Sequence, residues 1–296
     1  MPKTIDFTNC KRFTDRTHNC ADENKIAVEY EGERYILKSP PARGKRPAED
    51  LYNSSIISEH IAGSIFNMMG IKAQKTMLGT YTVNGRAELV CACREFTDGN
   101  KHLYDFRSVK NSIADSGNDG AETELDGILE AIKKQKFIKP GMLLEHFWNM
   151  FIMDALLGNF DRNNSNWGIL YDKQAEKAEI APIFNCGSCL FLHAEESVIK
   201  IILESEIELN ARIYQFPTSA IKSDGERIYY YDFISSMKNE DCSKAVLRIV
   251  PKINIDLINR FIDNVPYISD IQKKCYKTYV TAKYEKILLP VYKKLI

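Results

Sequence analysis

The stretch that decides the fold is LLGNFDRNNSNWGILYDKQAEKAEIAPIFNCGSC, which covers residues 156–189. Two apolar runs within it, Trp167–Tyr171 and Glu179–Phe184, have the length of the two strands of a β-hairpin. Polar residues stand at the outer ends of these runs, with Asn166 before the first and Asn185 after the second. Since a hairpin brings its ends together, we expect the two asparagines to lie side by side.

A buried helix is predicted just before this hairpin. Apolar side chains between Met142 and Leu156 cover most of a helix surface, which is typical of a helix inside a core. Pro140 suits its first turn and Gly158 suits its end. Asp161 then follows on a loop that a rigid element anchors, and this placement suits a catalytic carboxylate.

The first third of the chain predicts two hairpins and one helix. Lys25–Tyr30 and Arg34–Lys38 flank a Glu-Gly-Glu turn. Thr76–Val83 and Arg86–Cys93 flank an Asn-Gly turn, whose two residues tolerate positive φ. Between the hairpins, Leu51–Met69 repeats apolar residues at helical spacing.

The rest of the chain is predicted to be mainly helical. Helical patterns cover residues 197–213, 240–250, 254–264 and 269–296, and residues 111–126 predict a surface loop. We therefore predict an α+β fold with two lobes. A small antiparallel β-rich lobe with one helix takes residues 1–97, and a larger, mainly helical lobe takes residues 98–296. A cleft between two such lobes is a natural ligand site.

The bulk composition argues against several classes of protein. The 40 basic and 40 acidic residues cancel, whereas proteins that bind nucleic acid usually carry a basic excess. The most apolar segment, Met142–Leu157, is too short and too polar to span a membrane. The start lacks the apolar core of a signal peptide, and 8 cysteines without such a signal indicate reduced thiols. We expect a cytoplasmic protein without nucleic-acid or membrane partners, although specialised export is compatible with this sequence.

One alternative within the deciding stretch is a metal site. Cys186 and Cys189 have the spacing of a zinc or redox motif, and His193 is close in sequence. A convincing fourth ligand is missing, so chance spacing is the stronger interpretation.

The polar residues fit the parts that phosphoryl transfer needs: a basic group at the phosphates, bridging metal ions, and a carboxylate that orients the attacking hydroxyl. Lys38 ends a predicted strand, and Glu59 lies beside the apolar stripe of the next helix, so an ion pair would hold the lysine over the phosphates. Asp161 is the candidate carboxylate. Asn166 and Asn185 offer oxygens to magnesium, which prefers oxygen ligands. The conjunction of these residues, rather than any one of them, indicates the chemistry.

In this conjunction the chain resembles the HipA-like serine/threonine kinases, in particular their shorter CtkA-type branch. The resemblance spans nearly the whole chain. It is carried by YILKSPP around Lys38, ISEHIAGSIFNMMGIKAQKTMLGTY from Ile57, LLGNFDRNNSNWG from Leu156, APIFNCGSCL from Ala181 and ELNARIYQFP from Glu208.

The resemblance implies a two-lobed protein-kinase-like fold that uses ATP and Mg²⁺. It implies phosphorylation of Ser or Thr in protein substrates and in the kinase itself. Arg94, Glu95 and Phe96 would be the hinge whose backbone meets adenine. Some HipA-type members are toxins that act on an aminoacyl-tRNA synthetase, and nothing in the composition identifies such a target here.

The resemblance also implies roles for the polar residues. Lys38 would contact phosphate, Asp161 would be the catalytic aspartate, and Asn166 would be a metal ligand. Asn185 stands where relatives carry a second, metal-binding aspartate. Asparagine offers one neutral carbonyl oxygen there, so we expect weaker magnesium binding and a rate lower by about 10²–10³-fold.

Two further departures from the family pattern bear on activity. Asn163 replaces the histidine of an Asp-Arg-His pattern. Arg16–Asn24, the expected equivalent of a glycine-rich phosphate loop, has no glycine, so it would cradle phosphates less well.

Other functions therefore stay open at the level of sequence. One is a pseudokinase or nucleotide-binding regulatory module with little activity. Another is a non-enzymatic interaction protein that uses the helical half of the chain. An aspartate replaced by design to silence a toxic kinase would also leave Asn185 in this place.

Overall fold

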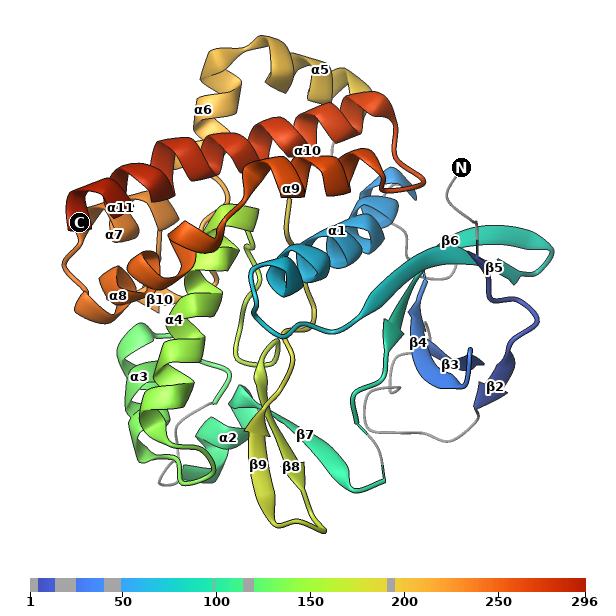
Figure 1. Cartoon of the computed structure of the whole chain (residues 1–296), viewed down its shortest axis with the longest axis horizontal. Coiled ribbons are helices and arrows are strands. Elements are labelled where there is room, and N and C mark those ends of the chain that lie inside the picture. Colours follow the sequence, from blue (N-terminus) through green and yellow to red (C-terminus); the bar gives the residue numbers. More distant parts are fainter. Residues whose placement is uncertain (1–4, 14–24, 40–48, 98, 114–119, 191–194) are drawn as a thin grey trace.

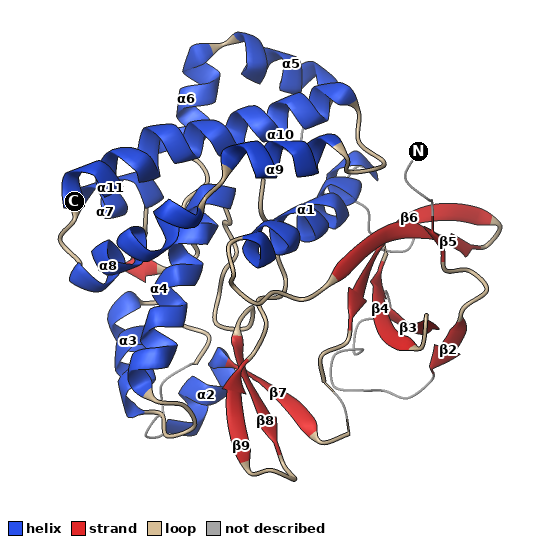
Figure 2. Cartoon of the chain, viewed as in Figure 1, coloured by secondary structure: helices blue, strands red, loops and turns tan. Residues whose placement is uncertain are grey.

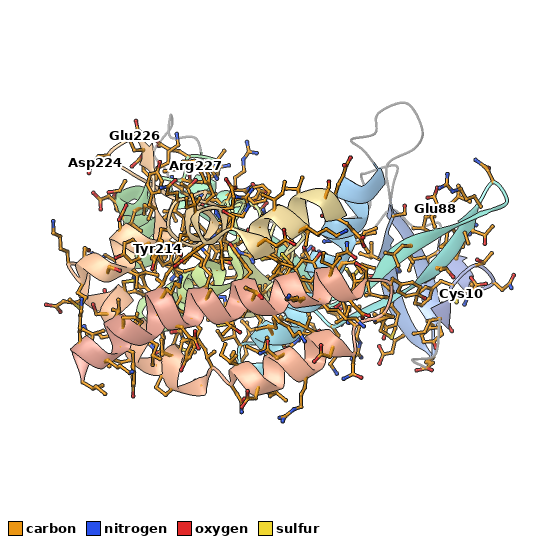
Figure 3. The ribbon with its side chains drawn as sticks, turned by 90° about the horizontal axis from the view of Figure 1, so that it is seen from above. Cys10, Glu88, Tyr214, Asp224, Glu226 and Arg227 are labelled. Atoms are coloured by element: carbon orange, nitrogen blue, oxygen red, sulfur yellow. The ribbon has the colours of Figure 1, made fainter. Side chains whose placement is uncertain are left out.

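The computed structural model describes residues 5–13, 25–39, 49–97, 99–113, 120–190 and 195–296. A curled β-sheet forms one end of the molecule and helices form most of the rest (Figure 1, Figure 2). Seen from above, Cys10 and Glu88 lie at the strand-rich end, and Asp224, Glu226 and Arg227 lie at the opposite end (Figure 3). The predicted α+β class is confirmed.

The curled sheet has six strands in the order β1-β5-β6-β4-β3-β2. They are β1 (Ile5–Asp6), β2 (Lys11–Phe13), β3 (Lys25–Tyr30), β4 (Glu33–Lys38), β5 (Thr76–Val83) and β6 (Arg86–Arg94). Both predicted hairpins are present, because β3 pairs with β4 and β5 with β6 in antiparallel register. Their turns use positive φ, which is 52° at Glu31 and 51° at Asn84.

One helix, α1 (Glu49–Met68), packs against β5 and β6, as the sequence predicts. Ile57, Ile61 and Ile65 of this helix are buried together with Leu78 and Cys91 of the sheet. The other face of the sheet encloses a small second core of Phe7, Val28, Leu37, Tyr81, Val90 and Ala92. Neighbouring residues of β6 therefore serve two different cores, as strand alternation requires.

A second sheet has three strands in the order β7-β8-β9 and lies in the helical part. Its strands are β7 (Lys101–Asp105), β8 (Gly168–Asp172) and β9 (Lys177–Ile180). The pair β8–β9 is the predicted hairpin. The sequence does not predict β7, whose residues are partly or fully exposed and show no apolar alternation.

The helices of this part are α2 (Phe106–Ile113), α3 (Leu125–Lys134), α4 (Pro140–Leu157), α5 (Glu196–Glu204), α6 (Glu206–Tyr214), α7 (Tyr230–Ser236), α8 (Glu240–Ile249), the 3₁₀ turn η1 (Val250–Lys252), α9 (Ile255–Asp263), α10 (Asp270–Lys283), the π-helical turn η2 (Tyr284–Leu288) and α11 (Leu289–Leu295). A small hairpin of β10 (Lys222–Ser223) and β11 (Glu226–Arg227) precedes α7. None of the described helices combines the length and apolar character that crossing a membrane requires.

The predicted buried helix is α4, and Gly158 ends it with a φ of 66°. A Cβ at that glycine would lie 2.1 Å from the hydroxyl of Tyr279, so only glycine fits there. The helix predicted over residues 197–213 is instead divided into α5 and α6. Ser205 causes the break, because its side chain accepts from the backbone N–H of Glu208 and caps α6.

Two predicted loops fall wholly or partly outside the described residues. The ends of the loop predicted at 111–126 belong to α2 and α3, and residues 114–119 are not described. The segment expected to cover phosphates, residues 16–24, also lies outside the described part of the chain.

Candidate active site

Lys38 meets Glu59 where the curled sheet joins the helical part. The ammonium of Lys38, at the end of β4, lies 3.0 Å from the Glu59 carboxylate on α1, so the predicted ion pair is present. Glu59 is only 3% exposed, and its charge therefore needs this partner. Burial disfavours the charged form of Lys38, but the carboxylate outweighs burial and raises the pKa of the lysine. The site thus holds a fixed positive charge at neutral pH.

Asn185 links this lysine to the loop that follows α4. Its Oδ1 accepts from Lys38 Nζ at 3.2 Å, and its Nδ2 donates to Asn166 Oδ1 at 2.5 Å. The predicted proximity of the two asparagines is confirmed. Asn166 in turn donates to Asp161 Oδ2 at 3.3 Å. Asn185 has a φ of 60°, in the left-handed region that asparagine adopts more readily than most residues. One chain of contacts therefore joins Lys38 to Asp161.

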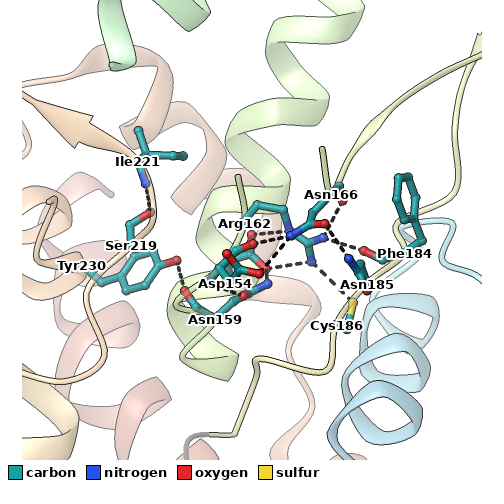
Figure 4. Close-up of polar contacts among 11 residues, drawn as sticks. Asp154, Asn159, Arg162, Asn166, Phe184, Asn185, Cys186, Ser219, Ile221 and Tyr230 are labelled. Carbon is teal, nitrogen blue, oxygen red and sulfur yellow. Dashed lines mark hydrogen bonds and ion pairs between the residues drawn. The ribbon is translucent and has the colours of Figure 1, made fainter. Parts of the chain in front are cut away.

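A buried arginine holds the two loops together beneath these side chains (Figure 4). Arg162 Nε lies 3.0 Å from Asp154 Oδ2, and each side chain is 1% exposed. Its Nη1 donates to the carbonyls of Asn166 and Phe184 at 2.7 and 2.6 Å, and its Nη2 donates to Cys186 Sγ at 3.4 Å. Burial disfavours the charge of Arg162, but Asp154 outweighs burial and raises the pKa of the arginine. The loop after α4 and the loop after β9 thus share one anchor.

Further contacts fix the turn that leads into Asp161, and Figure 4 shows the one between Tyr230 and Asn159. The side chain of Asn159 accepts from the Asp161 N–H at 3.0 Å, and the Tyr230 hydroxyl donates to the Asn159 carbonyl at 2.6 Å. Arg227 of β11 donates to the Phe160 carbonyl. The Asp161 side chain itself is exposed, so a second molecule can reach a carboxylate whose backbone is held in place.

A cavity of about 580 Å³ lies beside these residues. Lys38 and Asn185 line it together with Ile36, Phe96 and Phe184. The rings of Phe96 and Phe184 are 5.8 Å apart between centroids. Apolar rings and an ammonium in one cavity suit a ligand with a flat apolar part and an anionic part.

Of the three residues predicted to form a hinge, Phe96 lines this cavity and the other two do not. Arg94 pairs its side chain with Glu33. The Glu95 carboxylate lies 2.7 Å from Arg34 Nε, close enough for an ion pair but without the alignment of a hydrogen bond. The Glu95 N–H donates to the Arg34 carbonyl at 2.8 Å, so that backbone group is used within the sheet.

Gly187 allows the loop after β9 to approach α1. A Cβ at this glycine would lie 2.5 Å from Ser55 Oγ and 3.4 Å from Glu59 Oε2. Sequence reasoning included this glycine in the Phe184–Gly187 motif without predicting its close approach to α1, and it missed the Arg162–Asp154 pair. One signal for the pair was available, because Asp154 is the one charged residue in the apolar last half of α4, residues 150–157, and a carboxylate there requires a buried partner.

The oxygen donors near Asp161 fit a magnesium ion that nucleotide phosphates also hold. Asn166 and Asn185 would hold the ion through neutral carbonyl oxygens, and the Asp161 carboxylate beside Asn166 adds a negative charge next to them. Magnesium is usually bound through one or two carboxylates plus phosphate oxygens and waters, so this set is sufficient only with phosphates. Among the described residues, no three His, Cys, Asp or Glu side chains are placed to hold a metal, and His193 lies outside that part of the chain.

Comparison with known proteins identifies relatives of the whole chain. No family model matches the chain. The chain is 42% identical over 289 residues to the serine/threonine-protein kinase CtkA of Helicobacter pylori, a match that covers 97% of the chain and 87% of that protein. The crystal structure of a Helicobacter pylori proinflammatory kinase CtkA has a TM-score of 0.92 at 41% identity, and the match covers 99% of this chain and 98% of that one.

A more distant likeness concerns the fold alone. HipA of Shewanella oneidensis MR-1, in a complex with HipB and operator DNA, has a TM-score of 0.55 at 15% identity, over 95% of this chain and 68% of the compared chain. The fold class and the family resemblance expected from the sequence are therefore confirmed. The chain belongs to the family of the serine/threonine-protein kinase CtkA, and it shares the fold of HipA.

Proposed function

We propose that this chain is an ATP- and magnesium-dependent serine/threonine protein kinase that also phosphorylates itself. One observation carries the proposal: the ammonium of Lys38, 3.0 Å from Glu59, lies in the wall of the cavity beside Asn185. The kinase relatives support the reaction class. That no nucleic acid or membrane takes part stays a prediction from composition.

In this proposal the adenine ring enters the apolar side of the cavity next to Phe96, and Lys38 binds phosphate oxygens. Asp161 accepts a hydrogen bond from the Ser or Thr hydroxyl of a protein substrate. The hydroxyl oxygen forms a bond to the γ-phosphorus while the bond from that phosphorus to the leaving ADP oxygen breaks, and the hydroxyl proton passes to Asp161.

Magnesium, when bound with the nucleotide, supplies electrostatic stabilisation of the transferring phosphoryl group. Asn166 and Asn185 are the side chains that would hold it. Asn185 contributes no charge, and its Oδ1 already accepts from Lys38 at 3.2 Å. Turnover is therefore expected to be slow, by about 10²–10³-fold relative to a site with aspartate there.

The same hydrogen bonds favour a second function, a nucleotide-binding regulatory module with little turnover. The amide of Asn185 satisfies Lys38 with its oxygen and Asn166 with its nitrogen. These side chains thus stay in place through protein contacts alone, and binding of a nucleotide does not require efficient phosphoryl transfer.

Two measurements test the proposals. Calorimetric titration of ATP, with magnesium and with EDTA, should show binding that Lys38→Met weakens; no binding of the parent chain in either condition would exclude both functions. A radiolabelled-phosphate assay should then show autophosphorylation above an Asp161→Ala blank. Binding without any signal above that blank would leave the regulatory module as the function.

A further inference from the structure

The strand β9 forms an open edge of the second sheet. The order β7-β8-β9 places β9 on the outside (Figure 1), and no other described strand pairs with it. The Ala181 N–H donates to the Gly168 carbonyl at 3.1 Å, and hydrogen-bonded residues alternate along an antiparallel pair. The N–H and C=O groups of Ala178 and Ile180 therefore point away from β8. Such a row of backbone groups is a template for one more strand.

A groove of about 680 Å³ lies along this edge. Ala178 and Ile180 line one side, and Ile71, Phe137 and Met142 also line it. Phe137 is 41% exposed and Met142 is 58% exposed. Single exposed apolar side chains are common on protein surfaces, but two of them beside an open strand edge and further apolar lining residues indicate an interaction site.

The acidic residues at the groove are paired with basic residues, whereas two of its lysines have no acidic partner among the described residues. Its two carboxylates, Glu145 and Glu179, each have a basic partner. Lys72 and Lys139 also line the groove and are exposed, and neither has an acidic partner in the part of the chain that the structure describes. The groove therefore offers two positive charges to an anionic ligand.

His146 also lines the groove, and its ring adds no charge there. Its Nε2 is buried and has no hydrogen-bond partner among the described residues. Burial lowers the pKa of His146 to about 4, so the ring is neutral at physiological pH.

We infer that this groove binds an extended peptide segment of a partner protein, which adds a strand to β9 and carries acidic and apolar residues in alternation. The backbone of the segment pairs with the outward groups of β9, a recurring mode of peptide recognition. Its apolar side chains contact Phe137 and Met142, and its carboxylates approach Lys72 and Lys139.

The groove adjoins the chain segment that leads into the active-site loop. The Ile183 N–H donates to the Lys72 carbonyl at 2.8 Å, and the Gln74 N–H donates to the Ile183 carbonyl at 2.8 Å. Phe184 and Asn185 follow directly in sequence. A peptide on β9 therefore lies against the same segment that positions Asn185. Its binding acts on the nucleotide site from outside the cavity.

The test compares two fluorescein-labelled peptides by fluorescence anisotropy with the whole chain. The first alternates valine and glutamate over about nine residues. The second carries proline in place of the central valine, which interrupts a strand ladder. We expect the first peptide to bind, and the second to bind at least about fivefold more weakly because one or more backbone hydrogen bonds are lost. Equal binding of the two peptides would overturn the inference.

Variants locate the binding. Ala178→Pro removes an outward N–H and leaves the bonds to β8 in place, so it should weaken binding about fivefold. Lys139→Glu should weaken binding by about threefold to tenfold. The control Lys200→Glu makes the same charge change on α5 and should bind like the parent.

Two results would refute the site. One is the absence of binding up to millimolar peptide. The other is binding that neither Ala178→Pro nor Lys139→Glu weakens, in variants whose circular dichroism matches the parent. Hydrogen exchange gives a second readout, since the amides of residues 178 and 180 should become protected when the first peptide is bound.

Discussion

Replacing Asn185 by aspartate tests how strongly ATP binding at this site depends on magnesium. In the structure, Asn185 accepts from Lys38 through Oδ1 and donates to Asn166 Oδ1 through Nδ2 at 2.5 Å. Asn185→Asp turns the first contact into an ion pair but sets two acceptor oxygens against each other in the second. A magnesium ion resolves this conflict, because it takes both oxygens as ligands. We therefore expect ATP binding by the variant to depend on magnesium much more than ATP binding by the parent.

The magnitude follows from the added charge. Two unit charges about 4 Å apart interact by about 1 kcal/mol in water and by about 4 kcal/mol at an effective dielectric constant of about 20. Asn185 is exposed, so the lower part of this range applies. A gain of about 1–3 kcal/mol corresponds to about 5-fold to 150-fold in magnesium affinity.

Calorimetric titration of ATP at a series of magnesium concentrations measures this difference. In EDTA the variant should bind ATP more weakly than the parent, since the new carboxylate repels phosphate, and with magnesium it should bind more tightly. Autophosphorylation, measured with radiolabelled phosphate against Asp161→Ala, should be faster in the variant by up to about 10²–10³-fold. Gln174→Asp adds the same charge at the far end of the β8–β9 hairpin and should change neither quantity. Equal magnesium dependence and equal rates in Asn185→Asp and the parent would refute the reasoning.

Three further substitutions test the packing around the site and the stability of the fold. Gly187→Ala should weaken ATP binding by about tenfold in the same titration, because its methyl group would lie 2.5 Å from Ser55 Oγ and must displace the loop or α1; unchanged affinity would contradict the need for this close approach. Arg162→Met should lower the free energy of unfolding by about 3–5 kcal/mol, since Asp154 is left buried without its counter-charge. Urea denaturation measures this loss, and the double variant Arg162→Met/Asp154→Leu should recover much of it; no recovery would mean that the loss has another cause. Burial lowers the pKa of Lys283 from 10.5 to about 7, so the unfolded chain binds more protons between these values and stability rises with pH across that window. Lys283→Met should therefore raise the melting temperature at pH 6 to 7, and a gain of the same size at pH 10 would argue against this cause.

Local patterns explain how much of the fold is predictable from the sequence. The hairpin turns carry their own signals, since Asn84 takes a φ of 51° in the Asn-Gly turn that the sequence predicts. The helical register of Ile57 and Ile61 likewise places Glu59 beside the apolar stripe, where Lys38 reaches it. These features depend on neighbours in sequence or on one pairing of adjacent elements, so periodicity and turn chemistry are enough to predict them.

The missed features depend on packing between distant segments. The position of β7 is decided by its pairing with β8. Gly168, the first residue of β8, lies 67 residues after Lys101, the first residue of β7. The inward direction of Arg162 depends on the carbonyls of Asn166 and Phe184, which converge only once the hairpin has formed. For the hinge, the family resemblance predicts residues 94–96 and does not distinguish among them, and in the structure Phe96 is the one of the three that lines the cavity.

The shared anchor at Arg162 has a consequence for inhibitor choice. Because Nη1 of this guanidinium donates to the Phe184 carbonyl at 2.6 Å as well as to the Asn166 carbonyl, moving the backbone of Phe184 would break one hydrogen bond to a buried charged group, at a cost of about 1.5–3 kcal/mol. Compounds that bind only after Phe184 has left the cavity would meet this resistance. Flat compounds that stack near Phe96 would bind without moving Phe184. A screening collection for this pocket should therefore be weighted towards compounds that accept Phe184 where it lies.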